Sequence, residues 1–381
     1  MADRIAVQFN GKSDPSATRR VAIISDGFAG CSEEQISPLC EYRERLRDQY
    51  KIVLRQMNLD DVLISGLKSL SRFDIICLKM TYRTPCDMAT DVIDRVRASA
   101  PGARIVYLDG DDDICVQWNH VISKVDLYVK KHAFVDRSEY KRTFVGKSNL
   151  HDYVFRNFGH EVGPLDYGNL GDEPVVIRST GPIDTDDLKK IVVGWNIGLD
   201  RRLKAIRENA ASSPINFERE IDITFRGSAA KNTVVSFLRG GITDKLRAME
   251  NDYKILAPAE RVDQAQYYAE LKRSKICVSP FGFGEICWRD FEAVFCGSLL
   301  VKPDMGHIET DPNIFQAYET YVPVKWDFSN LEEVCRRYLE NEAERRRIVT
   351  NARSVLLGYF ENEKFLEVAN SVLSRAPLEQ S

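Results

Sequence analysis

The densest group of residues able to do chemistry lies between Ser274 and Lys302. Residues 275–279, with the apolar run 276–278, predict a buried strand. It leads into the loop Ser279–Gly284, which has glycine at positions 282 and 284. Glycine permits positive φ and a close approach of the backbone to another group. A helix is predicted to open near Glu285. Its N-terminus would offer free N–H groups and the positive end of a dipole, so this loop could bind a pyrophosphate.

Three charged residues follow in the predicted helix. Glu285, Arg289 and Glu292 are spaced i, i+4 and i+7, which places them on one stripe of a helix. Arginine binds phosphate oxygens in a bidentate manner, and a carboxylate accepts hydrogen bonds from sugar hydroxyls. The same residues could instead form salt bridges on an exposed helix. Their place behind a glycine-rich turn, at the sheet edge where ligands bind, favours the binding role.

A second chemical group is the acidic run Asp109-Gly110-Asp111-Asp112-Asp113, which follows another predicted strand. The structural interpretation is a turn whose carboxylates cap the next helix. Alternatively, one aspartate lines an acceptor cleft at the carboxyl end of its strand, or the aspartates hold a divalent cation, which prefers oxygen ligands. The sequence favours the turn and leaves the other two interpretations open.

The elements that would position these residues alternate between strands and helices. In the first half, strands are predicted at residues 21–26, 51–56, 73–79 and 103–108, with helices at 33–49, 59–70 and 88–99. The pattern restarts with strands at residues 221–225, 253–256, 275–279 and 299–301 and with helices at 232–238 and 264–273. Such alternation is typical of parallel, doubly wound sheets, and we expect an α/β protein with two Rossmann-like halves. Residues 144–214, which hold many Gly, Pro and Asp, are interpreted as the end of the first domain together with the crossover into the second.

The composition excludes several function classes. Lys and Arg number 53 against 57 Asp and Glu, a net charge of −4, which does not fit a protein that neutralises nucleic-acid phosphate. No apolar run approaches the ~20 residues of a membrane span, and residues 1–10 do not resemble a signal peptide, so we expect a cytoplasmic protein. The nine cysteines form no C-x-x-C pair, which favours reduced thiols over disulfides or zinc.

The segment from Tyr267 to Gly297 resembles the donor-binding half of glycosyltransferases with the GT-B fold, closest to the exostosin-like and family-1-like branches. The resemblance rests on a strand, then Ser279-Pro280, the two glycines, Arg289, Glu292-Ala293 and Gly297. The run from Asp222 to Ser228 is similar, more weakly, to the strand and glycine loop that open the donor domain.

The resemblance implies two Rossmann-like domains that face each other across a cleft. The acceptor domain would be residues 1–200, the donor domain residues 201–355, and a final helix with a tail, residues 356–381, would pack back on the first domain. Glu292 would bind ribose or sugar hydroxyls, and Arg289, Arg226 and Lys231 would offset the charge of the diphosphate. The donor-binding residues implied are Arg226, Gly227, Lys231, Ser279, Gly282, Gly284, Glu285, Arg289, Glu292 and His307.

The implied reaction moves a sugar from a UDP- or GDP-sugar to a glycan, lipid, protein or small-molecule acceptor, in glycan or polysaccharide synthesis. Cationic side chains would stabilise the leaving diphosphate, so no cofactor is required and Mg²⁺ or Mn²⁺ is not expected. Asp26 and Asp112 are the candidate bases. Glu285 and Glu292 are separated by six residues where the familiar motif has seven, which leaves the stereochemical outcome open. A lipid or polysaccharide acceptor would bring the enzyme to the inner face of a membrane.

Two alternatives stay open. One is a nucleotide-sugar epimerase or hydrolase of the same two-domain shape, which needs no acceptor cleft. The other is a non-catalytic nucleotide-sugar-binding or scaffold subunit of a polysaccharide assembly complex. Such a subunit would keep Gly282, Gly284 and Arg289 but needs no base, so binding without turnover would identify it.

Overall fold

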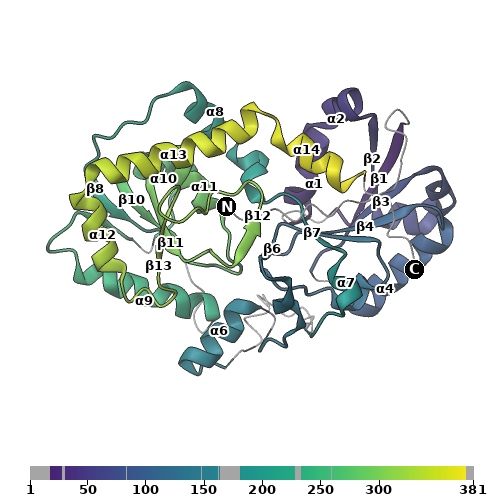
Figure 1. Ribbon diagram of the computed structural model, residues 1–381, viewed down its shortest axis with the longest axis horizontal. Coiled ribbons are helices and arrows are strands. Elements are labelled where there is room, and N and C mark those ends of the chain that lie inside the picture. Colours follow the sequence, from purple (N-terminus) through teal and green to yellow (C-terminus); the bar gives the residue numbers. More distant parts are fainter. Residues whose placement is uncertain are drawn as a thin grey trace.

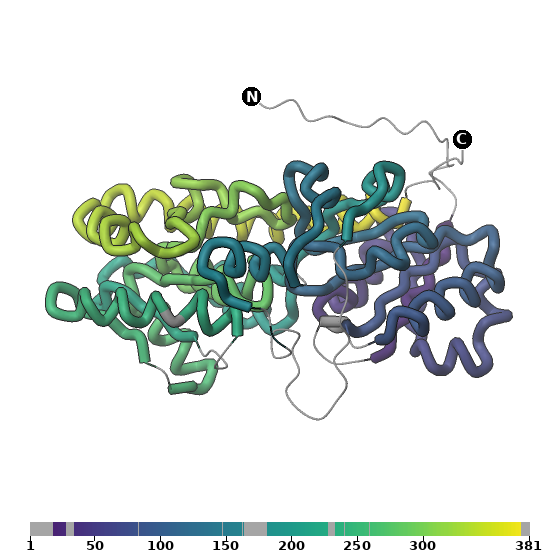
Figure 2. Tube along the Cα trace, turned by 90° about the horizontal axis from the view of Figure 1, so that it is seen from below, coloured from purple at the N-terminus to yellow at the C-terminus, as the bar shows by residue number. Residues whose placement is uncertain are grey.

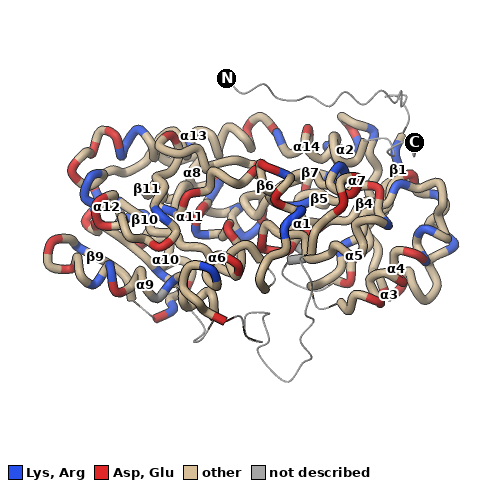
Figure 3. The backbone as a smooth tube through the Cα atoms, turned by 60° about the horizontal axis from the view of Figure 1, so that its bottom comes forward, with Lys and Arg blue, Asp and Glu red and all other residues tan. Residues whose placement is uncertain are grey.

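The computed structural model describes residues 18–27, 31–82, 84–146, 148–161, 163, 181–227, 233–258 and 260–374. Two parallel sheets lie side by side and define two lobes (Figures 1 and 2). The first lobe is built on the six-stranded sheet, residues 19–193, and the second lobe on the five-stranded sheet, residues 221–324. Acidic and basic residues are interspersed over both lobes (Figure 3).

The sheet of the first lobe has the strand order β2-β1-β3-β4-β5-β7. Every neighbouring pair in it is parallel. The middle strands β3 and β4 are buried along their whole length, as expected for apolar strands covered by helices on both faces. The strands are β1 (Arg19–Ser25), β2 (Ile52–Asn58), β3 (Ile75–Lys79), β4 (Arg104–Asp109), β5 (Leu127–Lys130) and β7 (Ile191–Val193).

The helices of the first lobe are α1 (Cys31–Glu41), α2 (Arg43–Tyr50), α3 (Leu59–Asp61), α4 (Cys86–Ser99), α5 (Asn119–Ile122), α6 (Asn149–Phe158) and α7 (Thr185–Leu188). The helix predicted over residues 59–70 is instead a series of short α, π and 3₁₀ turns. Asn58 begins this series by accepting hydrogen bonds from the backbone N–H groups of Asp60 and Asp61.

The sheet of the second lobe has the strand order β13-β11-β10-β8-β9, again with parallel pairs. Its strands are β8 (Ile221–Thr224), β9 (Ile255–Leu256), β10 (Ser274–Val278), β11 (Leu299–Pro303) and β13 (Val322–Val324). Its helices are α9 (Val234–Ala248), α10 (Gln264–Arg273), α11 (Trp288–Cys296) and α12 (Leu331–Glu340), and α8 (Lys204–Ser212) packs against α11. The predicted α/β class with two doubly wound halves is confirmed.

Two further connections join the lobes. Strand β6 (His132–Phe134) of the first lobe pairs antiparallel with β12 (Ile308–Thr310) of the second. Helix α13 (Glu342–Glu361) runs along the second lobe, and α14 (Lys364–Val372) continues to the first lobe beside α2 (Figure 1). Phe365 and Leu366 of α14 share a buried cluster with Val21 of β1, so the predicted return of the last helix is confirmed. The domain boundaries at residues 200 and 355 stay a prediction.

No helix in the described part of the chain is long and apolar enough to cross a membrane. The cysteines whose side chains the structure describes, from Cys40 to Cys335, are free thiols. Most of them are buried, which is the usual setting of a thiol that packs as a small apolar group.

Candidate functional site

A cavity of about 570 Å³ lies between the lobes, where strands of the second sheet end. Its walls come from the segments that follow β8, β9 and β10, from α9, α10 and α11, and from Asp112 of the first lobe. Because the carboxyl ends of parallel strands meet at one edge, the fold itself brings these segments together. The lining residues are Asp112, Ile197, Arg202, Arg226, Gly227, Arg239, Pro258, Glu260, Arg261, Val262, Gln264, Tyr267, Gly282, Phe283, Gly284, Ile286, Cys287, Trp288, Arg289 and Glu292.

Two arginines form the positive side of the cavity. Arg289 of α11 donates from Nη2 to the carbonyl oxygen of Arg226, and its guanidinium lies 5.5 Å from the ring centre of Phe225. Its Nε and Nη1 are buried and have no hydrogen-bond partner among the described residues. Arg239 of α9 lines the same cavity, and burial together with the charge of Arg289 lowers its pKa. Buried donors without a partner beside a second cation are suited to an anion.

No pattern in the sequence identifies Arg239 as a site residue. It lies in α9, one residue beyond the helix predicted at residues 232–238, and an arginine there gives no local signal of function. The fold brings Arg239 to the cavity beside Gly282. A Cβ at position 282 would lie 3.0 Å from Nη2 of Arg239, so glycine leaves room for this side chain. Gly282 therefore allows the glycine loop and Arg239 to share one wall of the cavity.

Arg226 lines the cavity, but it is already paired. Its guanidinium forms an ion pair with Glu270 and donates from Nη1 to the carbonyl oxygen of Glu260 at 2.6 Å. The hydrogen bond that Arg226 donates to Glu270 raises the pKa of Arg226. Gly227 is required by packing, since a Cβ there would lie 2.6 Å from the ring of Phe225. Lys231, the other predicted cation of this loop, lies outside the described residues.

Glu292 lies on the same helix and in the same cavity wall as Arg289, as predicted. Its Oε1 accepts a hydrogen bond from the hydroxyl of Tyr268 at 3.2 Å, and burial raises the pKa of its carboxyl. Arg289 and Glu292 are three residues apart, which puts them on neighbouring turns of one helical face. The wall thus offers a cation and a carboxylate side by side.

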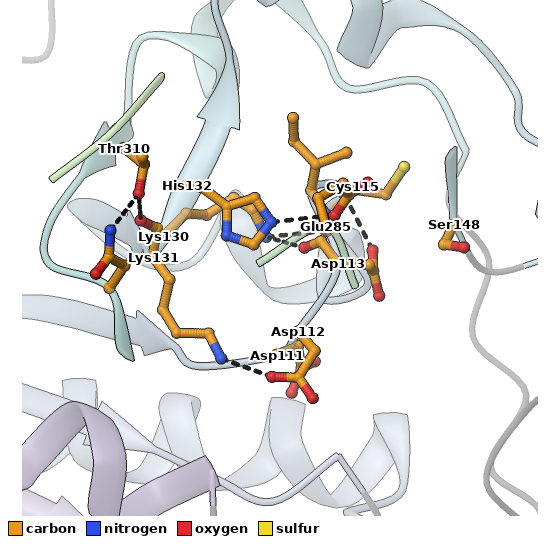
Figure 4. A network of polar contacts seen from close by, with 12 residues as sticks. Asp111, Asp112, Asp113, Cys115, Lys130, Lys131, His132, Ser148, Glu285 and Thr310 are labelled. Carbon is orange, nitrogen blue, oxygen red and sulfur yellow. Dashed lines mark hydrogen bonds and ion pairs between the residues drawn. The ribbon is translucent and has the colours of Figure 1, made fainter. Parts of the chain in front are cut away.

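The predicted position of Glu285 is wrong. Helix α11 begins at Trp288, three residues later than predicted, so Glu285 does not share a helical stripe with Arg289 and Glu292. Its side chain is fully buried and turns toward the first lobe, where Oε2 accepts from Nε2 of His132 at 3.1 Å and from the N–H of Ile114 at 3.0 Å (Figure 4). Glu285 joins the lobes and does not line the cavity.

Ser279 also lies outside the cavity lining. Its hydroxyl donates to Oδ1 of Asp290 at 2.6 Å, and Asp290 in turn accepts from the N–H of Cys287 and lies 3.1 Å from Nζ of Lys302. The side chains of Asp290 and Lys302 are fully buried. This group ties the end of β10 to the first turn of α11 and so fixes the start of the helix that carries Arg289.

Two properties were predicted for the glycine loop, a positive φ and a close approach of the backbone to another group. Neither Gly282 nor Gly284 has a positive φ, so the predicted conformational role is wrong. The predicted close approach is confirmed, and at Gly284 the approaching group is part of the first lobe. A Cβ at position 284 would lie 1.5 Å from the backbone oxygen of Asp112. Glycine at this position allows the two lobes to meet beside the cavity.

The acidic run is held by partners from its own lobe. Asp109 accepts from Nζ of Lys130 and from the hydroxyl of Tyr128, each at 2.8 Å. Asp111 accepts from the indole N–H of Trp118 at 2.9 Å, and Asp113 from the N–H of Cys115 at 3.0 Å. Asp112 is the member of the run that lines the cavity, with a side chain 42% exposed. No group of three or more His, Cys, Asp or Glu in the described ranges could hold a metal ion.

Two other predicted residues lie away from the cavity lining. Asp26 follows β1, as predicted, and its carboxylate accepts from the N–H of Thr81. His307 lies in the loop before β12, with its ring centre 5.1 Å from that of Trp326, and burial lowers the pKa of its imidazole. Of the two candidate bases, the structure therefore brings Asp112 to the cavity and leaves Asp26 outside its lining.

A buried carboxyl beside the cavity predicts a pH-dependent stability. Glu34 of α1 lies 3.4 Å from Arg202 and 4.0 Å from Lys131, and burial raises the pKa of its carboxyl to about 7. The folded protein therefore keeps a proton that the unfolded chain releases above its ordinary pKa of 4.5. This contribution to stability is present below that pH and is lost as the pH rises to about 7.

In Glu34→Gln a neutral amide replaces the carboxyl group, so this position no longer titrates. We expect its free energy of unfolding, relative to the parent, to rise between about pH 4.5 and pH 7 by up to about 3 kcal/mol and to stay level above that. Urea unfolding across this pH range measures the difference. A difference that does not change with pH would contradict the buried, proton-holding state of Glu34.

Comparison with known proteins identifies the fold of the chain and matches one segment of it to a family model. No curated protein matches the sequence. The catalytic domain of starch synthase IV from Arabidopsis thaliana, bound to ADP and acarbose, has a TM-score of 0.50 at 11% identity, over 94% of this chain and 100% of that chain. The fold is GT-B. The predicted fold class is thereby confirmed.

Two further solved structures cover the chain to the same extent. An α-glucosyltransferase in complex with UDP-glucose and DNA containing an abasic site has a TM-score of 0.49 at 10% identity, over 94% of this chain and 100% of that one. A glycosyltransferase from Rickettsia africae ESF-5 has a TM-score of 0.47 at 12% identity, over 94% and 100%. Residues 239–367 match the family model described as glycosyl transferase-like, so the glycosyltransferase resemblance is confirmed for this part of the GT-B chain. Arg239, Arg289 and Glu292 lie within the match.

Proposed function

We propose that the protein is a glycosyltransferase that binds a nucleotide sugar in the cavity and transfers the sugar to an acceptor at the first lobe. The observation that carries this proposal is the pair of buried nitrogens of Arg289 that have no hydrogen-bond partner in the described part of the chain. They lie within a glycosyl transferase-like domain and in a cavity that Asp112 of the other lobe also lines. The domains would be residues 1–200 for the acceptor and 201–355 for the donor, with residues 356–381 packing back.

The diphosphate of a UDP- or GDP-sugar would lie against Arg239 and Arg289. Their charges would stabilise the departing nucleoside diphosphate as the bond between sugar and phosphate breaks, so the reaction would not require a metal. Glu292 would accept hydrogen bonds from ribose or sugar hydroxyls. Arg226, which is paired with Glu270, would shape the pocket and add to its positive potential without turning to the phosphate.

Asp112, in preference to Asp26, would be the general base. In an inverting reaction it would take the proton of the acceptor hydroxyl as the new bond forms. The acceptor would be a glycan, lipid, protein or small molecule that enters from the first lobe. A scaffold subunit would bind the donor without this step, so release of nucleoside diphosphate separates the two functions.

A thermal-shift panel of UDP, GDP, ADP, CDP, TDP and their common sugars tests donor binding. A ligand at about 100 times its Kd stabilises a protein by about 2.7 kcal/mol, which for a chain of this size is a shift of a few degrees. We expect one nucleotide series to stabilise the parent and to lose its effect in Arg289→Ala and Glu292→Ala. Arg337→Ala, on the exposed face of α12, is the matched control and should keep the shift. A folded parent that no nucleotide stabilises would contradict the proposal.

A further inference from the structure

Three consecutive basic residues, Lys130, Lys131 and His132, bind carboxylates of both lobes. Figure 4 shows the pairs of Lys131 with Asp112 and of His132 with Glu285. Lys130 binds Asp109 at the end of β4, Lys131 binds Asp112 in the acidic run, and His132 binds Glu285 in the second lobe. Of the three carboxylates, only that of Asp112 belongs to the cavity lining. We call Lys130, Lys131 and His132 the basic triplet.

Lys131 is fixed from within the protein. Its side chain is 4% exposed, and Nζ lies 2.8 Å from Oδ1 of Asp112 and 4.0 Å from Oε2 of Glu34. Its backbone oxygen accepts a hydrogen bond from the hydroxyl of Thr310 in β12, at 3.0 Å. A buried ammonium group without a carboxylate partner is costly, so the place of Nζ beside the carboxylate of Asp112 is favoured.

The backbone around Asp112 is also held on two sides. Nζ of Lys130 donates to the carbonyl oxygens of Asp113 at 3.3 Å and Cys115 at 3.0 Å. On the other side, the backbone of Asp112 lies against Gly284. These contacts hold the acidic run in place, and the hydrogen bond from Lys131 helps to direct the side chain of Asp112.

We propose that Lys131 is a positioning residue for the transfer reaction: it holds Asp112 in the cavity as an ionised carboxylate that accepts the proton of the acceptor hydroxyl. This inference rests on the proposed function. In that step the hydroxyl proton passes to the Asp112 carboxylate, the acceptor oxygen bonds to the anomeric carbon, and the nucleoside diphosphate leaves with the electrons of its bond to the sugar. Lys131 touches neither donor nor acceptor.

Removal of Lys131 changes the charge of the whole cluster. The groups that face Glu34 are Lys131, Asp112, Asp200 and Arg202. Without the ammonium group, Arg202 is the cation that remains among these named groups, and it faces three carboxyl groups. A carboxylate that loses its cation and gains uncompensated neighbours binds a proton more tightly, so Asp112 would be protonated up to a higher pH and would serve less well as a base.

The test compares Lys131→Met, Lys131→Arg and the control Lys124→Met, which removes a lysine from a more exposed pair with Asp94 in the same lobe. Release of nucleoside diphosphate is measured with UDP-glucose, GDP-mannose and ADP-glucose as donors and water as acceptor, from about pH 5 to pH 9, and UDP, GDP and ADP affinity is measured by calorimetry. For Lys131→Met we expect kcat to fall about 100-fold and the acid limb of its pH profile to move to higher pH, with nucleotide affinity unchanged within about twofold. Lys131→Arg should restore the acid limb, and Lys124→Met should match the parent.

The outcomes separate the two claims. An active parent whose acid limb stays in place in Lys131→Met, or whose nucleotide affinity falls as much as kcat, overturns the positioning role and leaves the proposed function standing. A parent that neither binds a nucleotide nor releases nucleoside diphosphate overturns the proposed function and this inference with it. Where Lys131→Met does not fold, Lys131→Gln, which keeps a hydrogen-bond donor without the charge, is measured against the same criteria.

Discussion

Gly284→Ala is expected to lower the free energy of unfolding by more than about 3 kcal/mol and to abolish nucleotide binding. The added Cβ would lie 1.5 Å from the backbone oxygen of Asp112, a distance that no adjustment of side chains can relieve. Either the glycine loop or the acidic run must move, and both line the cavity. Urea unfolding and the thermal shift caused by the preferred nucleotide measure the two effects.

Gly102→Ala is the matched control, because a Cβ at position 102 meets nothing within 4 Å. We expect its stability to stay within about 0.5 kcal/mol of the parent, with nucleotide binding unchanged. A Gly284→Ala variant as stable as Gly102→Ala would show that the lobes do not meet at this point.

Lys302→Met is expected to destabilise the protein by about 3–5 kcal/mol, the usual cost of leaving one partner of a buried ion pair without the other. The side chains of Lys302 and Asp290 are both fully buried and lie 3.1 Å apart. Without Lys302, Asp290 keeps the hydrogen bonds from Ser279 and Cys287 among the described residues, and its charge loses the buried cation. Urea unfolding measures the loss.

Two control variants make this result specific. Lys302→Met combined with Asp290→Asn should recover part of the lost stability, since the buried charge is removed while an oxygen still accepts hydrogen bonds. Lys364→Met, which breaks a pair with Glu367 whose side chains are about half exposed, should cost less than about 1 kcal/mol. A single Lys302→Met variant that behaves like Lys364→Met would contradict the buried pair.

Much of the fold could be predicted because its long strands are apolar runs that both faces of a sheet bury. The eight predicted strands all occur, as β1 to β4 and β8 to β11. Short apolar segments such as residues 21–25 and 275–278 favour a buried strand over a helix or a loop. Strands β6 and β12 could not be predicted. Each has three residues, and they pair with each other across 170 residues or more of chain, so only the joined lobes stabilise them.

The site residues could be predicted where their spacing along one helix brings them together. They could not be predicted where segments distant in the sequence meet. Arg289 and Glu292 lie on one helix, and their spacing alone places them together. Glu285 turns to His132, and Lys131 turns to Asp112, because of contacts between distant segments that leave no periodic signal in the sequence. Asp112 was a candidate because it follows a strand of a parallel sheet, and the closing of the lobes at Gly284 brings it to the cavity.

A crystal structure of the parent with its preferred nucleoside diphosphate tests whether the two cavity arginines bind the donor. We expect the diphosphate to lie in the cavity between Arg239 and Arg289 and to accept hydrogen bonds from Nε or Nη1 of Arg289, with the ribose within reach of Glu292. A nucleotide bound elsewhere on the chain, without a hydrogen bond from Arg289, would contradict the proposed donor site.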